Sequence, residues 1–400
     1  MSILVQKYGG SSLSDLARVR AVANKVVEAR EAGHDLVVVV SAMGDSTDDL
    51  LAMARELAPN PSRRELDMLL SVGERISMAL LSIAIQECGH QAVSLTGSQC
   101  GIITTHQHSN ARIMDVRPFR VQDELAQGRI VIVAGYQGSS YRREVTTLGR
   151  GGSDTTAVAL AAALGAEACE IYSDVDGVFS ADPRVVLSAR QLLALDYEEM
   201  IEMARSGAKV LNEQAVEFAR LSKIALYARK VDAPSAPGTV VRPDGFDQLI
   251  AQAERGLPAV AVSHLNHGLW VCAAQTAADQ VLELLAERDC IVCEWRPGES
   301  LAAFLGTENL HDADALSRAL TEFEDGASQS PAGLVSVVGT GIGAQPRWAQ
   351  LGLGALHKAD IRPMATSISL SRLSWVVDQA QVAPAANALH AAFIELVDNS

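Results

Sequence analysis

The sequence contains few cysteines, few aromatic residues and fewer basic than acidic side chains. Six cysteines in 400 residues are too few for a disulfide scaffold, and aromatic residues make up only 4% of the chain. Lysine and arginine total 33 against 48 aspartates and glutamates, which gives a formal net charge of -15. This balance argues against a basic surface for nucleic-acid phosphates and favours small-molecule partners.

The sequence also lacks the patterns typical of a targeting segment and of a membrane-spanning segment. The first ten residues, MSILVQKYGG, have no basic region ahead of a long apolar segment, and no apolar run approaches the length of a membrane span. We therefore expect a cytoplasmic protein without a membrane partner. Hydrophobic residues form 48% of the chain and charged residues 20%, which is typical of a folded globular protein.

The common nucleotide-binding motifs do not occur. There is no G-x-x-x-x-G-K-[ST] loop, and the glycines do not form the dinucleotide G-x-G-x-x-G fingerprint. The H-R-D and D-F-G motifs of protein kinases are absent too. If the protein handles phosphate, it must use another scaffold.

Alternating β-branched runs and helical patterns fill the first part of the chain. Residues 1–245 therefore predict an α/β domain whose mainly parallel sheet is sandwiched by helices. The segment VDAPSAPGTVVRPDG at 231–245 holds three prolines and two glycines and breaks this pattern. Beyond it, residues 246–328 and 329–400 each follow the order strand, helix, then one or two strands, which predicts two small α+β modules.

Four strand ends of the first domain carry glycines or small hydroxyl residues at the start of a helix. They are KYGGSS at 7–12, SAMGDSTD at 41–48, GYQG at 135–138 and GRGGSD at 149–154. Free backbone N–H groups at helix N-termini bind phosphate and other anions. Each loop alone is compatible with a simple turn, but four of them at strand ends of one α/β domain predict a ligand site.

The chain resembles the aspartokinases of the amino acid kinase superfamily. Besides the four loops, the matching blocks are SVGERIS at 71–77, NARIMDV at 110–116, TTLGRGGSDTTAVALAAALGA at 146–166, YSDVDGVFSADPR at 172–184 and GAKVL at 207–211. The resemblance implies the amino acid kinase fold followed by two ACT-like (βαββαβ) domains. It also implies transfer of the γ-phosphoryl group of ATP, with Mg²⁺, to the β-carboxylate of L-aspartate. The product, 4-phospho-L-aspartate, leads toward lysine, threonine and methionine.

The same resemblance assigns roles to individual residues. As catalytic residues it implies Lys7 and Asp154, with the aspartate orienting the lysine. As aspartate-binding residues it implies Ser41, Thr47, Glu74, Arg150 and Ser153, with Arg150 on the α-carboxylate and Glu74 on the α-ammonium group. As ATP-binding residues it implies Lys7, Gly9, Gly10, Ser11, Ser173, Asp174, Phe179, Arg184 and Lys209. No dedicated metal ligands are expected, and a carboxylate nucleophile needs no general base because it is ionised at neutral pH.

The sequence departs from the family pattern at three places. Phe179 stands where many relatives have tyrosine, and Asn212-Glu213-Gln214 replaces His-Pro-Arg. Both departures bear on ATP affinity and substrate preference. Relatives usually carry Pro-Gly at the loop that opens the first ACT helix, whereas the matching places here are AAQTAADQ and GAQPRWAQ. We therefore expect weakened or lost feedback inhibition, with the modules retained to build a homodimer or a higher homo-oligomer.

Two other functions remain open at the level of the sequence. One is a related amino acid kinase that acts on a different carboxylate substrate. The other is a catalytically silent, amino-acid-sensing regulatory subunit. The presence of Lys7, Arg150 and Asp154 together favours an active enzyme over a sensor.

Overall fold

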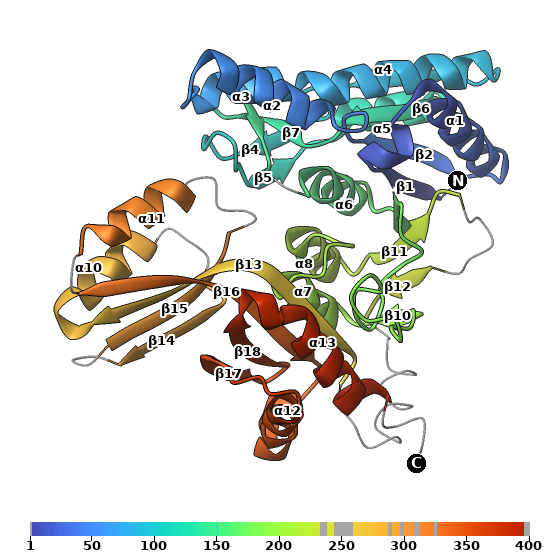
Figure 1. Ribbon diagram of the computed structural model, residues 1–400. Coiled ribbons are helices and arrows are strands. Elements are labelled where there is room, and N and C mark those ends of the chain that lie inside the picture. The colour runs from blue at the N-terminus through green and yellow to red at the C-terminus, as the bar shows by residue number, and fades with distance from the viewer. Residues whose placement is uncertain are drawn as a thin grey trace. The chain divides into compact units, whose positions relative to one another are not determined.

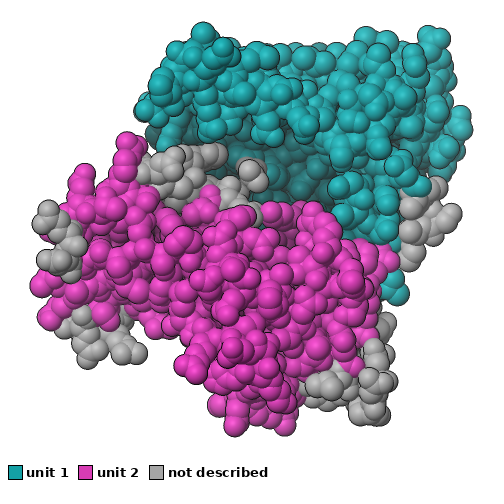
Figure 2. Space-filling model, viewed as in Figure 1, with its two compact units in different colours: residues 1–178, 192–200, 210–245 teal, residues 179–191, 201–209, 246–400 magenta. Residues whose placement is uncertain are grey.

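The chain forms two compact units whose segments alternate along the sequence. The computed structural model describes residues 2–149, 151–232, 238–243, 259–286, 290–296, 300–307, 313–323 and 326–395 (Figure 1). Unit 1 comprises Met1–Val178, Leu192–Met200 and Val210–Gly245, and unit 2 comprises Phe179–Gln191, Ile201–Lys209 and Phe246–Ser400 (Figure 2). Two short segments that precede residue 245 thus group with the C-terminal part of the chain.

Unit 1 is organised around an eight-stranded sheet in which every pairing is parallel except that of β11 with β12. The strands run in the order β10 (Ala194–Leu195), β12 (Thr239–Val241), β11 (Ala225–Lys230), β9 (Ala168–Ser173), β1 (Ile3–Tyr8), β2 (Asp35–Val40), β6 (Ile130–Ala134) and β3 (Ala92–Leu95). Val37–Val40 of β2 have no exposed side chains, because both faces of the sheet are covered.

Helices cover both faces of this sheet. On one face α1 (Leu16–Glu31) and α4 (Val72–Glu87) pack against β2 and β6, and on the other α6 (Gly152–Leu164) packs against β1, β2 and β9 and against α8 (Glu213–Ser222). The remaining helices of unit 1 are η1 (Gly10–Leu13), α2 (Ser46–Leu57), α3 (Arg63–Leu70) and α5 (Phe119–Ala126). Helix α7 (Tyr197–Arg205) begins in unit 1 and ends in the unit 2 segment Ile201–Lys209. The predicted α/β sandwich is confirmed.

A smaller four-stranded sheet lies beside the main one in unit 1. Its order is β5 (Ile113–Val116), β4 (Ile102–Thr104), β7 (Gln137–Ser140) and β8 (Val145–Thr147). Gln137 Nε2 donates to the backbone oxygen of Ser71, between α3 and α4, at 2.9 Å. This sheet therefore supports the junction of α3 and α4, at which the block SVGERIS begins.

The expectation that no apolar run approaches the length of a membrane span is wrong for one stretch of the chain. The stretch Arg63–Glu87, which combines α3 and α4, is long and apolar enough to cross a membrane by length and composition. Half of its apolar 18-residue window is buried within the protein, and the stretch contains the buried acids Asp67 and Glu74. These features are those of a core helix, in which the apolar residues pack on a sheet instead of on lipid.

Unit 2 contains a six-stranded antiparallel sheet built from two similar halves. Its order is β14 (Val292–Arg296), β15 (Ser300–Gly306), β13 (Ala261–Ala274), β16 (Ala327–Val338), β18 (Arg372–Asp378) and β17 (Ala365–Ser369). The helices are α10 (Gln275–Leu285), α11 (Ala313–Thr321), α12 (Pro346–Lys358) and α13 (Val382–His390), with short turns η2 (Ile342–Ala344), η3 (Gln379–Gln381) and η4 (Ala391–Glu395). Each half has the predicted order of strand, helix and two strands, and the central β13–β16 pairing joins them into one sheet.

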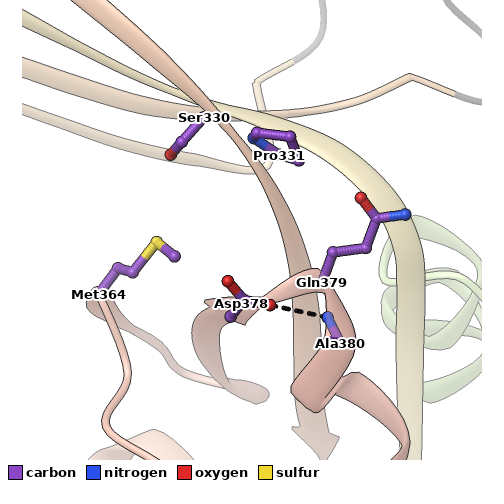
Figure 3. A pocket seen from close by; sticks show the side chains of 6 residues that line it. All are labelled: Ser330, Pro331, Met364, Asp378, Gln379 and Ala380. Atoms are coloured by element: carbon purple, nitrogen blue, oxygen red, sulfur yellow. Dashed lines mark hydrogen bonds between the residues drawn. The ribbon is translucent and has the colours of Figure 1, made fainter.

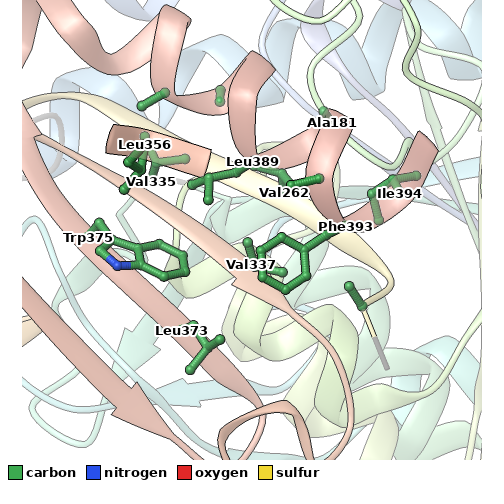
Figure 4. Close-up of a cluster of buried hydrophobic side chains, with 14 of the residues drawn as sticks. Ala181, Val262, Val335, Val337, Leu356, Leu373, Trp375, Leu389, Phe393 and Ile394 are labelled. Carbon is green, nitrogen blue, oxygen red and sulfur yellow. The ribbon is translucent and has the colours of Figure 1, made fainter. Parts of the chain in front are cut away.

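A cavity and an apolar core mark the second half of unit 2. The cavity measures about 570 Å³ and is lined by Ser330, Pro331, Met364, Asp378, Gln379 and Ala380 (Figure 3). The core packs Trp375, Val335 and Val337 of the sheet against Leu356, Leu389 and Phe393 of the helices (Figure 4).

The fully buried His390 contacts Ser180 Oγ at 2.9 Å through Nε2 and Glu395 Oε1 at 2.9 Å through Nδ1. His390 therefore ties the segment 179–191 to the C-terminal helix.

Candidate active site

A buried ion pair lies where β1 ends and α6 begins. Lys7 Nζ is 2.7 Å from Asp154 Oδ1, and each side chain is 12% exposed. Asp154 occupies the first turn of α6, where the helix dipole and free backbone N–H groups favour a negative charge. The two residues are far apart in sequence, and the parallel pairing of β1 with β9, the strand that follows α6, brings them together.

The loops after β1 and β2 contact each other directly. Gly44 N donates to Gly10 O at 3.1 Å, and Ser41 N donates to Tyr8 O at 3.1 Å. A Cβ atom added at Gly10 would lie only 2.9 Å from Ala42 O, so only glycine allows this approach. Ser41 and Thr47 are partly buried, and Thr47 lies in the first turn of α2. The structure thus places these predicted substrate and phosphate loops side by side.

Glu74 is a buried carboxylate with one unpartnered oxygen. It is 3% exposed, and its Oε1 accepts a hydrogen bond from Ala42 N at 3.2 Å. Its Oε2 has no hydrogen-bond partner among the residues that the structure describes. Burial raises the pKa of the Glu74 carboxyl from 4.5 to about 7, an effect that the hydrogen bond from Ala42 only partly opposes. A cation from a ligand would satisfy this oxygen.

Two further groups, the fully buried Asp67 and the partly buried Tyr136, were not identified from the sequence. Asp67 is fully buried and accepts hydrogen bonds from Thr147 Oγ1 at 2.7 Å and from Ser109 N at 2.9 Å. Tyr136 has a positive φ of 66°, and burial raises the pKa of its phenol, which hydrogen-bonds to Thr147. No local sequence signal distinguished Asp67, because its partners come from other parts of the chain.

Arg150 lies outside the described residues, but its neighbours on both sides are placed. Gly149 and Gly151 have φ of 77° and 72°, values that favour glycine. Ser153 follows in the first turn of α6 and is 7% exposed. A Cβ added at Gly151 would lie 2.3 Å from Asn212 Nδ2. Asn212, the first residue of the segment that departs from the family pattern, therefore lies against Gly151. The sequence did not reveal this contact.

A cavity of about 460 Å³ opens beside the β1 loop. It is lined by Ser11, Ser12, Ser14, Arg18, Gly44, Asp45, Ser173, Asp174, Lys230, Val231 and Asp232. Three of these, Ser11, Ser173 and Asp174, are predicted nucleotide-binding residues. The buried Ser12 Oγ has no hydrogen-bond partner among the described residues. Arg18 and Lys230 also line the cavity and were not predicted from the sequence. Lys230 ends β11, a strand adjacent to β9.

Of the six other residues predicted to bind ATP, three belong to unit 2, namely Phe179, Arg184 and Lys209. Phe179 forms an isolated bridge with Gln191, and the exposed Arg184 pairs with Asp182 at 2.7 Å. This pairing holds the pKa of the Asp182 carboxyl below its usual value, chiefly through the hydrogen bond from the guanidinium group. Lys209 is the last residue of the segment Ile201–Lys209.

Comparison with known proteins identifies the group to which this chain belongs. The model of the amino acid kinase family matches residues 2–228. The chain is 43% identical to an aspartokinase of Mycolicibacterium smegmatis across 98% of its own length and 96% of the relative. It is 42% identical to an aspartokinase of Geobacillus stearothermophilus across 98% of its own length and 97% of the relative.

Solved structures share the fold as well. The crystal structure of E. coli aspartokinase III in complex with aspartate and ADP matches with a TM-score of 0.84 at 23% identity, covering 98% of this chain and 99% of that one. The sequence matches extend over both units at identities well above those of unrelated proteins. The chain therefore belongs to the aspartokinases, a group of kinases within the amino acid kinase family.

Proposed function

We propose that this protein transfers the γ-phosphoryl group of ATP to the β-carboxylate of L-aspartate. A carboxylate oxygen attacks the γ-phosphorus, the bond to the β–γ bridging oxygen breaks, and ADP and 4-phospho-L-aspartate leave. No proton moves in this step, because the acceptor, whose ordinary pKa is about 4, is already ionised at neutral pH. Catalysis then depends on alignment and charge stabilisation.

Lys7 supplies the positive charge for the transferring group in this proposal. Its Nζ is held at 2.7 Å from Asp154, at the carboxyl end of β1 and beside the Gly9-Gly10 turn. Asp154 is a positioning residue, since it fixes the ammonium group without contacting the substrate. Gly9, Gly10 and Ser11 would meet the phosphates through backbone N–H and hydroxyl groups.

The acceptor is proposed from one observation above all, the unpartnered Oε2 of Glu74. A buried carboxylate with a free oxygen is suited to an α-ammonium group, which acetylglutamate, carbamate and UMP lack. Arg150 would bind the α-carboxylate through its two parallel N–H donors. Ser41, Thr47 and Ser153 would complete the aspartate site with small polar contacts.

The nucleoside would occupy the cavity that Ser11, Ser173 and Asp174 line. Phe179, Arg184 and Lys209 are proposed as ATP contacts from the resemblance of the sequence alone. Mg²⁺ fits this site as an ion that arrives with ATP and is bound mainly by phosphate oxygens and water. Within the described part of the chain, no three His, Cys, Asp or Glu side chains gather as a metal site. When bound, the ion would neutralise phosphate charge.

Trapping of the acyl phosphate with hydroxylamine tests the proposed acceptor. Purified protein with ATP, Mg²⁺ and L-aspartate is expected to give aspartate hydroxamate, because an acyl phosphate reacts readily with this nucleophile. Parallel reactions with glutamate and acetylglutamate serve as controls and should give little product. Turnover with another acceptor but not with aspartate would replace the proposed substrate, and no turnover with any acceptor would favour the sensing subunit.

Feedback inhibition is proposed to be weakened or lost. In the loop after β16, Gly339 N donates to Ser371 O at 3.0 Å and Gly343 N to Leu370 O at 3.1 Å, so both donors are engaged by the turn between β17 and β18. The cavity of unit 2 does not replace this loop as an effector site, because it lies toward the other end of β16. Its lining residue Pro331 is eight residues before Gly339, about 27 Å along an extended strand.

Inhibition assays test this second proposal. Millimolar lysine, threonine or both are expected to leave the initial rate with aspartate within about twofold of the uninhibited rate. The control is direct competition by ADP, which should inhibit regardless of the regulatory unit. Strong inhibition by either amino acid, alone or combined, would contradict the proposal.

The same proposal includes a cellular location, an oligomeric state and a pathway for the enzyme. We propose that it acts in the cytoplasm as a homodimer or higher homo-oligomer, assembled through the ACT-like modules at 246–328 and 329–400. Its product would feed the synthesis of lysine, threonine and methionine.

A further inference from the structure

Two asparagines flank the loop that carries Arg150. A Cβ atom added at Gly149 would lie 2.9 Å from Asn110 Oδ1, and one added at Gly151 would lie 2.3 Å from Asn212 Nδ2. Both glycines have a positive φ, so neither the backbone conformation nor the available space accepts another residue. The backbone on each side of position 150 therefore packs directly against an amide side chain.

Asn212 is fixed by its role at the start of α8. Its Oδ1 accepts hydrogen bonds from Gln214 N at 2.9 Å and Ala215 N at 3.4 Å, which makes it the N-cap of that helix. The same oxygen accepts from Thr155 Oγ1 at 3.3 Å, in the first turn of α6. Asn212 thus joins the starts of two helices while its amide lies against Gly151.

Asn110 is held in place by its two neighbours in sequence. Ser109, at a positive φ of 66°, donates its N–H to the fully buried Asp67 at 2.9 Å. Ala111 N donates to Thr147 O at 2.9 Å. Asp67 also pairs with His108 Nδ1 at 2.7 Å. The segment around Asn110 is therefore anchored to α3 and β8.

We propose that Asn110 and Asn212 are positioning residues that hold Gly149 and Gly151, the two neighbours of position 150, and thereby set the affinity for the acidic acceptor. We call these two contacts the clamp. This inference rests on the proposed function, in which Arg150 binds the α-carboxylate of that acceptor. Loss of either asparagine removes the contact that holds Gly149 or Gly151 in its conformation. It also assigns a role to Asn212, which stands where relatives commonly have histidine.

Substitutions at position 212 separate the clamp from the helix cap. Serine and aspartate cap helices about as well as asparagine, whereas alanine does not. Asn212→Ser keeps the cap but shortens the side chain, and it should raise the KM for aspartate about tenfold through misplacement of the loop. Asn212→Asp keeps the helix cap and the shape of the side chain but adds a negative charge. It should raise the KM for aspartate further, and this additional increase should diminish at high salt concentration. The KM for ATP should stay within about twofold in both.

Asn110→Ala tests the other half of the clamp, and Asn24→Ala, on the exposed surface of α1, is the matched control. Asn110→Ala should raise the KM for aspartate about tenfold, whereas Asn24→Ala should leave both KM values unchanged. Unaltered aspartate KM values in Asn212→Ser and Asn110→Ala would overturn the proposal. Equal increases for ATP and aspartate would do so as well.

Hydrogen exchange supplies a readout that does not depend on the acceptor. Amides in peptides spanning 146–156 should exchange about tenfold faster in Asn110→Ala and Asn212→Ser, while peptides from β1 and β2 keep wild-type protection. If the wild type fails to phosphorylate aspartate but these peptides still exchange faster, the clamp stands and the proposed substrate falls. Unchanged exchange would reject the clamp whichever acceptor is used.

Discussion

Replacing Lys7 by alanine is expected to lower kcat by a factor of about 10² to 10³ while the KM for ATP rises only severalfold. The reason is that a fixed ammonium group stabilises charge most strongly where it develops during transfer, and removing one such donor typically costs this much. Lys7→Arg should recover little of the rate, because the larger guanidinium group places its charge differently. Rapid-quench or coupled assays at saturating ATP and aspartate measure the effect.

Folding must be separated from catalysis in this experiment. Lys7→Ala leaves Asp154 buried without its cation, which is expected to cost about 3 kcal/mol of stability, since each side chain of the pair is only 12% exposed. The double variant Lys7→Ala, Asp154→Asn removes the uncompensated charge and should regain most of the melting temperature. Its kcat should remain as low as that of Lys7→Ala alone, because the two residues act as a unit. A double variant that regains activity would exclude a catalytic role for Lys7.

The main architecture of unit 1 was predictable because its strands are buried on both faces. An uninterrupted run such as Val37–Val40 leaves no polar position for solvent, so the pattern itself predicts a covered parallel strand. The order of strand, helix and two strands in unit 2 was predictable for a similar reason, as its helices alternate with β-branched runs. The pairing of β13 with β16 into one sheet was not, since register between distant strands leaves no local signal.

The site was predictable where it depends on local loops and unpredictable where it depends on tertiary burial. The approach of Lys7 to Asp154 was implied by resemblance alone, and the structure brings the two side chains together. The position of Asn212 against Gly151 had no sequence signal, because the cap of α8 and the start of α6 meet only in the folded chain. The length of the apolar stretch Arg63–Glu87 was underestimated from the sequence, because Asp67 and Glu74 interrupt its run of apolar residues.

The raised pKa of Glu74 predicts a conflict between stability and function. The folded protein holds a proton on this carboxyl up to about pH 7, whereas the unfolded chain releases it near 4.5. Stability from this group is therefore fully present below about pH 4.5 and is lost as the pH rises through 7. At pH 8 the ionised, buried Glu74 costs about 3 kcal/mol, since a pKa difference of one corresponds to about 1.4 kcal/mol.

Glu74→Gln is accordingly expected to stabilise the substrate-free protein by about 3 kcal/mol at pH 8 and to have little effect at pH 4.5. The glutamine oxygen can still accept the hydrogen bond from Ala42 N, so the loop contact is retained. Urea unfolding at the two pH values measures the difference. Glu124→Gln is the matched control, because Glu124 is similarly buried but pairs with Arg129 at 2.6 Å and should gain nothing.

The same substitution should raise the KM for aspartate about 10²-fold, because a neutral amide offers no charge to the α-ammonium group. In the wild type this KM should rise about tenfold per pH unit as the pH falls below about 7, since binding requires ionised Glu74. In Glu74→Gln that dependence should vanish. A pH-independent KM in the wild type, or an unchanged KM in the variant, would remove Glu74 from the aspartate site. A gain in stability together with a loss of affinity is the outcome expected if the buried charge is retained for substrate recognition alone.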